Sequence, residues 1–182
     1  MPLFGAQAPT GLWTPADYGY RAFSFDPVVA VTSNAPTGAG IVQLMRVHLP
    51  VTATVTNVLI WVATGGTGLT AGQNFAALYS AAGARLDVTA DQSTNWAGTG
   101  LITMPLAGGA ITRTAADYYV AWWSNGTGLP VFMTRSGANT INGTLGAAAL
   151  RCATADTGIT TTGPANLGAM SSVQTATWVA LS

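Results

Sequence analysis

The feature that most limits the fold of this chain is its shortage of charged side chains. The 182 residues include no lysine and no glutamate, and six aspartates and six arginines supply all the charge, 7% of the sequence. Helices rely on glutamate and lysine for their propensity and for ion pairs between residues four apart. A chain without these two residues is poorly suited to helices, which favours β structure.

The apolar pattern indicates the same fold class. β-branched and aromatic residues occur in short bursts, separated by Gly, Pro, Asn and Thr at intervals of about ten residues, which is typical of sandwiches and barrels. We expect an all-β fold, an antiparallel β-sandwich of jelly-roll type over residues 37–182, preceded by an extended N-terminal arm over residues 1–36. The arm is too apolar for a free linker, and we expect it to lie against the domain itself or a partner chain. Long regular elements are excluded there by Pro2, Pro9, Pro15, Pro27 and Pro36.

The strand pattern is readable from residue 41 onwards, with one ambiguous stretch. Asn74–Leu86 fits either a helix or a hairpin, and we favour the hairpin because Gly83 would interrupt a helix. Thr54–Thr64 is apolar on both faces of its middle, which predicts burial on both sides. The remaining strands are expected at Ile41–Leu49, Gly100–Pro105, Asp117–Ser124, Pro130–Thr134, Ala148–Cys152 and Val173–Leu181.

The strongest strand pattern is Tyr118–Trp123, where every residue except one has high β-propensity. Both of its faces are bulky, so we expect one to pack in the sandwich core and the other to face a neighbouring subunit. Together with the aromatic residues of the arm, it supplies the candidate residues of an oligomer or attachment interface: Trp13, Tyr18, Phe23, Trp122 and Trp123.

The charge balance narrows the classes of partner. A net charge of zero leaves no basic surface for nucleic acid or for anionic membranes. The densest apolar run, Val58–Ala63, is far shorter than the roughly 20 residues of a membrane span, and no signal-peptide pattern is recognised. We therefore expect no nucleic-acid partner and no membrane insertion. The single cysteine, Cys152, has no cysteine partner for an intrachain disulfide or a metal site.

No motif in the sequence indicates catalysis. Most of the six aspartates stand beside turns, where such side chains commonly bond to nearby backbone. The single histidine, His48, has no Gly-x-Ser-x-Gly nucleophile motif to serve, and one His with one Cys is too few for zinc. A phosphate-binding loop of the Gly-Lys type needs a lysine. We predict no enzymatic activity, no cofactor and no metal.

One polar, loop-like stretch carries a large aromatic ring and has two interpretations. Trp96 could stack on a sugar, with Asn95 and Asp91 hydrogen-bonding its hydroxyls. Alternatively, Trp96 plugs one end of the core, and this is the interpretation that we favour.

The scarcity of charge also predicts assembly. Soluble monomers carry about a quarter charged residues, and sheets protect their edges with charged side chains. This chain has neither defence, so we expect its apolar edges and faces to be covered by copies of itself or by a larger particle.

Six segments of the sequence carry a resemblance to a known family: Thr54–Val58, Thr67–Tyr79, Val88–Thr94, Asp117–Trp122, Ser124–Thr127 and Trp178–Leu181. They resemble a β-sandwich domain of tailed-phage virion proteins. The similarity covers about residues 41–182 and points to small minor tail or fibre-type proteins of phages that infect high-GC Gram-positive hosts. It implies a virion component, often trimeric, at the tail tip, as a fibre or on the head, and it carries over no binding residues.

We therefore expect a non-enzymatic virion structural protein of the minor tail or fibre type, assembled in the host cytoplasm. Its expected partners are itself, as a homotrimer, and other virion proteins, with a host-surface glycan as a candidate ligand. A capsid-decoration or head-fibre protein of the same fold is the first alternative. A secreted carbohydrate-binding module is the second, and a glycan-degrading enzyme is weakened by the lack of glutamate and of an acid pair.

Overall fold

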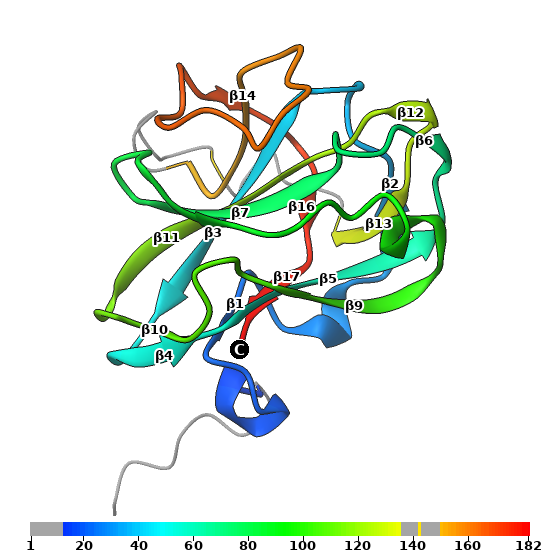
Figure 1. Ribbon diagram of the computed structural model, residues 1–182. Coiled ribbons are helices and arrows are strands. Elements are labelled where there is room, and N and C mark those ends of the chain that lie inside the picture. The colour runs from blue at the N-terminus through cyan, green and yellow to red at the C-terminus, as the bar shows by residue number, and fades with distance from the viewer. Residues whose placement is uncertain (1–12, 136–141, 143–149) are drawn as a thin grey trace, which may run out of the picture.

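Two antiparallel β-sheets packed face to face make up the protein in the computed structural model (Figure 1). The described residues are 13–135, 142 and 150–182. Figure 1 shows β3, β7 and β11 in one layer and β5, β9 and β17 in the other. The expected all-β sandwich is confirmed. From β3 onwards the described chain crosses repeatedly between the two sheets, while the pairs β7/β8, β14/β15 and β16/β17 each stay within one sheet.

The seven-stranded sheet, here called the β5 sheet, contains residues from both ends of the chain. Its order is β1-β17-β5-β13-β16, with β9 also paired to β5 and β2 paired to β13. Its strands are β1 (Ala22–Phe23), β2 (Thr32–Asn34), β5 (Asn57–Thr64), β9 (Gly100–Pro105), β13 (Val131–Arg135), β16 (Ala176–Thr177) and β17 (Val179–Leu181).

The six-stranded sheet, here called the β11 sheet, has the order β15-β14-β3-β11-β7-β8. Its strands are β3 (Val42–Leu49), β7 (Phe75–Ser80), β8 (Arg85–Val88), β11 (Ala116–Trp123), β14 (Cys152–Ala155) and β15 (Ser171–Ser172). Two small ladders and three short 3-10 helices complete the described fold: β4 (Ala53–Val55) with β10 (Ile111–Arg113), β6 (Thr67–Leu69) with β12 (Gly126–Gly128), η1 (Pro15–Tyr18), η2 (Pro27–Val29) and η3 (Asn95–Ala97).

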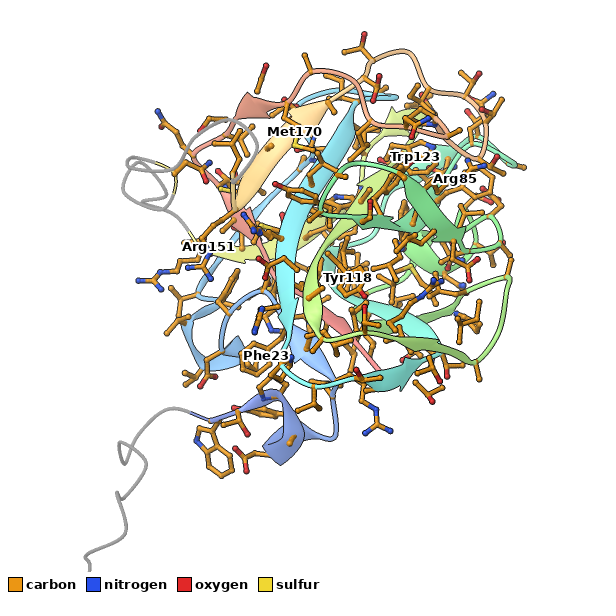
Figure 2. All side chains as sticks on the ribbon, turned by 90° about the vertical axis from the view of Figure 1, so that its left-hand side faces the viewer. Phe23, Arg85, Tyr118, Trp123, Arg151 and Met170 are labelled. Atoms are coloured by element: carbon orange, nitrogen blue, oxygen red, sulfur yellow. The ribbon has the colours of Figure 1, made fainter. Side chains whose placement is uncertain are left out.

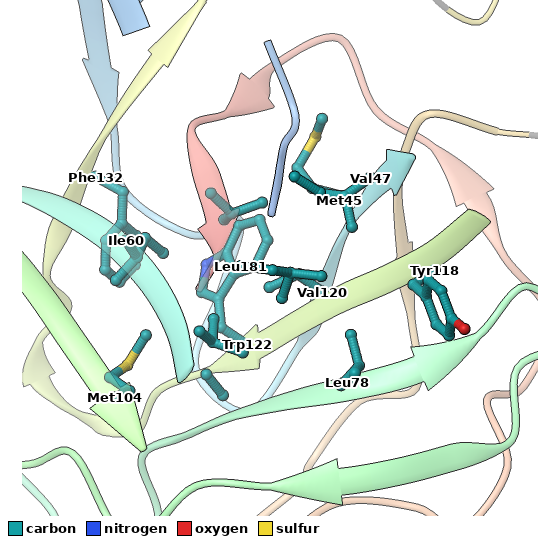
Figure 3. Close-up of a cluster of buried hydrophobic side chains, with 14 of the residues drawn as sticks. Met45, Val47, Ile60, Leu78, Met104, Tyr118, Val120, Trp122, Phe132 and Leu181 are labelled. Carbon is teal, nitrogen blue, oxygen red and sulfur yellow. The ribbon is translucent and has the colours of Figure 1, made fainter. Parts of the chain in front are cut away.

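The main hydrophobic core lies between the two sheets. Alternate residues of β5 and β11 point inward, so that Val58, Ile60 and Val62 meet Val120 and Trp122. Figure 3 shows Trp122, Ile60, Phe132 and Leu181 grouped among these strands. This packing explains the burial of Trp122, which is 3% exposed and therefore forms no subunit interface.

The outer face of the β11 sheet is apolar as well, and the chain covers it with its own residues. Trp123, Tyr119 and Tyr79 lie on this face, where Ile159 and Leu167 of the following segment pack against their cluster. Figure 2 shows Trp123 and Met170 near the top of the view.

The covering segment, 156–170, is held by hydrogen bonds to its backbone carbonyls. Trp123 Nε1 donates to the Thr161 carbonyl at 3.0 Å, and Tyr79 Oη donates to the Pro164 carbonyl at 2.9 Å. The prediction that this face of Tyr118–Trp123 meets a neighbouring subunit is therefore wrong. The alternation of the strand correctly indicates two apolar faces, but a segment about 40 residues later in the chain supplies the cover.

Most strand predictions agree with the structure, and the hairpin over 74–86 is confirmed. β7 and β8 pair antiparallel, and Gly83 in their turn has a φ of +87°, which favours glycine. The stretch Thr54–Thr64 is two strands, because the Thr56 and Asn57 amides both donate to the Ser182 carbonyl at the junction.

The predicted strand Val173–Leu181 also divides. β16 pairs with β13 and β17 pairs with β5, with a break at Trp178. Of the predicted strand Ala148–Cys152, residues 148 and 149 lie outside the described residues, and β14 begins at Cys152.

The described part of the predicted arm, residues 13–36, belongs to the sandwich instead of extending from it. β1 pairs with β17, β2 pairs with β13, and Ala22 is fully buried in the main core. Of the two surfaces predicted for this segment, the domain itself is therefore the one that it contacts. Residues 1–12 lie outside the described part.

Candidate functional site

The predicted sugar-binding tryptophan is inside the core. Trp96 is 0% exposed, and its ring meets Phe132 edge-on with 5.5 Å between the ring centroids. It therefore offers no surface to a ligand, and the structure agrees with the interpretation that Trp96 plugs the end of the core.

The two polar residues proposed beside Trp96 organise their own loop. Asp91 accepts hydrogen bonds from the Asn74 amide at 3.0 Å and from the amide and hydroxyl of Ser93. Partial burial raises the pKa of the Asp91 carboxyl, but these hydrogen bonds outweigh it and hold the pKa below its usual value. The Asn95 side-chain amide donates to Gln92 Oε1 at 2.8 Å. The structure thus gives both side chains partners within the loop.

The only ion-pair cluster among the described residues surrounds Asp117, on β11. Arg46 donates to Asp117 Oδ2, and His48 Nδ1 lies 2.8 Å from Oδ1, both from the adjacent strand β3. Partial burial raises the pKa of Asp117, but the hydrogen bonds from His48 and Arg46 outweigh it and lower the pKa overall. No group of three or more His, Cys, Asp or Glu side chains able to hold a metal occurs in the part of the chain that the structure describes.

The strongest candidate for an interaction site is a run of aromatic rings on the outer face of the β5 sheet. Tyr18 is its centre: its ring lies 5.7 Å from Trp13, 6.2 Å from Tyr20 and 6.3 Å from Phe23, measured between centroids. Tyr20 in turn meets Trp178 edge-on at 5.9 Å. The helix η1 and strand β1 therefore bring together three of the predicted interface residues, Trp13, Tyr18 and Phe23.

Strands β5 and β9 extend this surface beyond the reach of the N-terminal segment. Leu59 of β5 is buried beneath that segment, whereas Trp61, two residues further along the same face, is 45% exposed. Leu101 pairs directly opposite Trp61 and is 39% exposed. The expected burial of β5 on both sides is therefore right at Leu59 and wrong at Trp61.

A surface cavity of about 320 Å³ lies between the N-terminal segment and these strands. Its lining is almost entirely apolar and contains no charged side chain. Here the lining residues, together with Trp13, are called the aromatic patch: Trp13, Tyr18, Tyr20, Pro27, Ala30, Trp61, Leu101, Met133 and Trp178.

A buried carboxylate beneath the patch fixes the N-terminal segment. Asp26 accepts hydrogen bonds from the Tyr18 hydroxyl at 3.3 Å, the Trp13 amide at 3.3 Å and the Val28 amide at 2.9 Å. Desolvation, followed by the nearby negative charge of Asp26, raises the pKa of Tyr18. The hydrogen bond to Asp26 holds the Tyr18 ring in place within the patch.

Sequence reasoning identified one side of the aromatic patch and missed the other. Trp61, Leu101 and Trp178 were not among the predicted interface residues, although the outward alternation of Thr54–Thr64 placed Trp61 on the same face as Leu59. Their role depends on the pairing of β5 with β9 and β17, three segments distant in sequence.

Fold and site together define a class: an all-β, two-sheet sandwich that carries an uncharged aromatic patch on its surface. Neither a known family model nor a curated protein matches the chain. None of the helices in the described ranges has the length and apolar character needed to cross a membrane.

Proposed function

We propose that this chain is a non-enzymatic virion structural protein whose copies associate through the aromatic patch. One observation carries the self-association. The described part has seven exposed large apolar side chains, and four of them belong to the patch. Two more lie in or just after η2, the short helix whose Pro27 lines the cavity. The four are Trp13, Tyr18, Trp61 and Leu101; the two beside them are Val28 and Val31; only Val51 lies elsewhere.

The remainder of the fold strengthens this proposal. The outer face of the β11 sheet is covered by residues 156–170, so the aromatic patch is an apolar surface that the described residues leave open. Apolar patches of this kind on a protein surface mark interaction sites. No charged side chain lines the cavity, which suits a second uncharged surface, and the chain itself is poor in charge.

The virion assignment rests on the resemblance of residues 41–182 to phage tail and fibre-type proteins. Mass spectrometry of purified phage particles whose genome encodes the chain tests this assignment. We expect the chain as a stoichiometric component, and its absence from the particles contradicts a virion role.

Sedimentation velocity tests the self-association directly. We expect the unmodified chain to form an oligomer at micromolar concentration and Trp61→Arg to sediment as an 18.4 kDa monomer, because an arginine in the patch would lose its hydration on association. Val51→Arg is the matched control, since Val51 is 64% exposed but lies outside the patch. A monomeric unmodified chain, or a Trp61→Arg variant that still associates, contradicts the proposal.

A further inference from the structure

A second cavity, of about 290 Å³, lies where the two sheets meet near the start of β3 and the end of β11. It differs in chemistry from the aromatic patch, because amide and hydroxyl side chains share its lining with aromatic rings. The lining includes Gln43 from β3, Trp122 from β11, Phe132 from β13 and Thr177 from β16. No lining residue is ionisable.

Gln43 is the polar exception on the inner face of β3. The alternate residues Met45, Val47 and Leu49 all belong to the main core, whereas Gln43 places an amide in the same row. This residue is 7% exposed, and its Nε2 donates to Thr37 Oγ1 at 3.0 Å. No donor among the described residues contacts its Oε1. Gln43 Oε1 is not among the buried side-chain atoms that lack a partner, so this acceptor is accessible to a polar group in the cavity.

Two buried aromatic rings border the cavity, Trp122 (3% exposed) and Phe132 (1% exposed). Trp122 meets Phe132 edge-on at 6.2 Å, and the Nε1 of Trp122 is buried without a partner in the described structure. Figure 3 shows both rings within the core. Three further lining residues have side chains that form no hydrogen bond with any described residue: Asn34 and Gln174, which are exposed, and Thr175, which is partly buried.

We propose that this cavity binds one neutral sugar residue. A sugar ring presents hydroxyl groups, which can pair with the amides and hydroxyls of the lining, and apolar C–H groups, which can contact the partly buried Pro36 and Val173 side chains. An apolar side chain would leave the lining amides unpaired, and an ion would find no opposite charge. The volume is near the lower end of the roughly 300–1,000 Å³ range of ligand pockets, so it suits a single residue. The inference is independent of the aromatic patch.

Saturation-transfer NMR with a panel of methyl glycosides tests the proposal. The probes are the methyl glycosides of glucose, galactose, mannose, arabinose and N-acetylglucosamine. We expect saturable binding of at least one of them. Ala35→Trp is expected to abolish this signal, because Ala35 is an exposed lining residue and an indole there would fill the cavity.

Two further variants separate the site from effects on folding. Gln43→Leu keeps a similar volume and removes the amide, so we expect a folded protein that binds about fivefold more weakly or worse. Ala71→Trp, at an exposed position outside the cavity, should bind as the unmodified chain does. Trp61→Arg should also bind normally, which distinguishes this site from self-association. The proposal is overturned if no probe binds saturably, or if Ala35→Trp binds as tightly as the unmodified chain.

Discussion

Replacing Trp96 with alanine should destabilise the fold by about 3–5 kcal/mol, the range for large aromatic residues removed from a core. Trp96 is 0% exposed and packs edge-on against Phe132, whose own ring also contacts Trp122. Truncation therefore opens a cavity in an aromatic cluster at the end of the core. If Trp96 were instead a ligand-contacting surface residue, the same change would cost about 0.5 kcal/mol or less.

Urea denaturation monitored by circular dichroism measures this difference in the free energy of unfolding. Thermal unfolding gives a second readout: for a chain of this length, 1 kcal/mol shifts the melting temperature by about 2–4 °C, so Trp96→Ala should melt about 6–20 °C below the unmodified chain. Measurements at several protein concentrations separate folding from association. Val51→Ala, at a position 64% exposed, is the control and should change stability by about 0.5 kcal/mol or less.

A second substitution separates the ring from its N–H group. The Trp96 Nε1 is buried without a partner among the described residues, which costs about 1–3 kcal/mol. Trp96→Phe removes that donor and keeps most of the aromatic packing, so it should be much less harmful than Trp96→Ala. The packing argument fails if Trp96→Ala loses less than about 1 kcal/mol with an unchanged denaturant slope.

Two further predictions concern the covering segment and the Asp117 cluster. Gly163→Ala should destabilise the protein by at least about 2 kcal/mol, because a Cβ there would lie 2.6 Å from Trp123 Cη2. Gly158→Ala is the control: Gly158 has a similar positive φ but open surroundings, so this variant should lose only about 1–2 kcal/mol. Equal losses of the two variants in urea denaturation would contradict the clash. The folded-state pKa of Asp117 lies below its unfolded value of about 3.9, so its stabilisation is present above that pH and is lost as the pH falls through the folded pKa. Asp117→Asn should therefore lower stability at pH 7 and flatten the acid limb of stability against pH, and an unchanged acid limb would refute this.

The predictability of the strands follows from how local their signals are. The hairpin over 74–86 depends on a glycine in a turn and on alternation within a few residues, and it is found as predicted. The breaks at Thr56 and Trp178 have no local signal. The break at Thr56 arises because the backbone amides of Thr56 and Asn57 donate hydrogen bonds to the Ser182 carbonyl. The break at Trp178 arises because β16 pairs with β13 and β17 pairs with β5.

The candidate site was only partly predictable for a related reason. Trp13, Tyr18 and Phe23 are close in sequence, and their aromatic character in an apolar segment already indicated a contact surface. Trp61 and Leu101 join them only through strand pairing. The polar cavity at Gln43 combines residues from β3, β11, β13 and β16, so no spacing along the chain could indicate it.

The sequence by itself determined the all-β character of this protein, since propensity, alternation and the absence of glutamate and lysine act residue by residue. It also showed that several faces are apolar. Only the tertiary structure decided which of those faces stay exposed: residues 156–170 cover Trp123, whereas nothing in the described chain covers Trp61. The physical reason is that burial depends on contacts between segments far apart in the chain. A residue pattern indicates that a face is apolar, but it does not indicate which segment packs against that face.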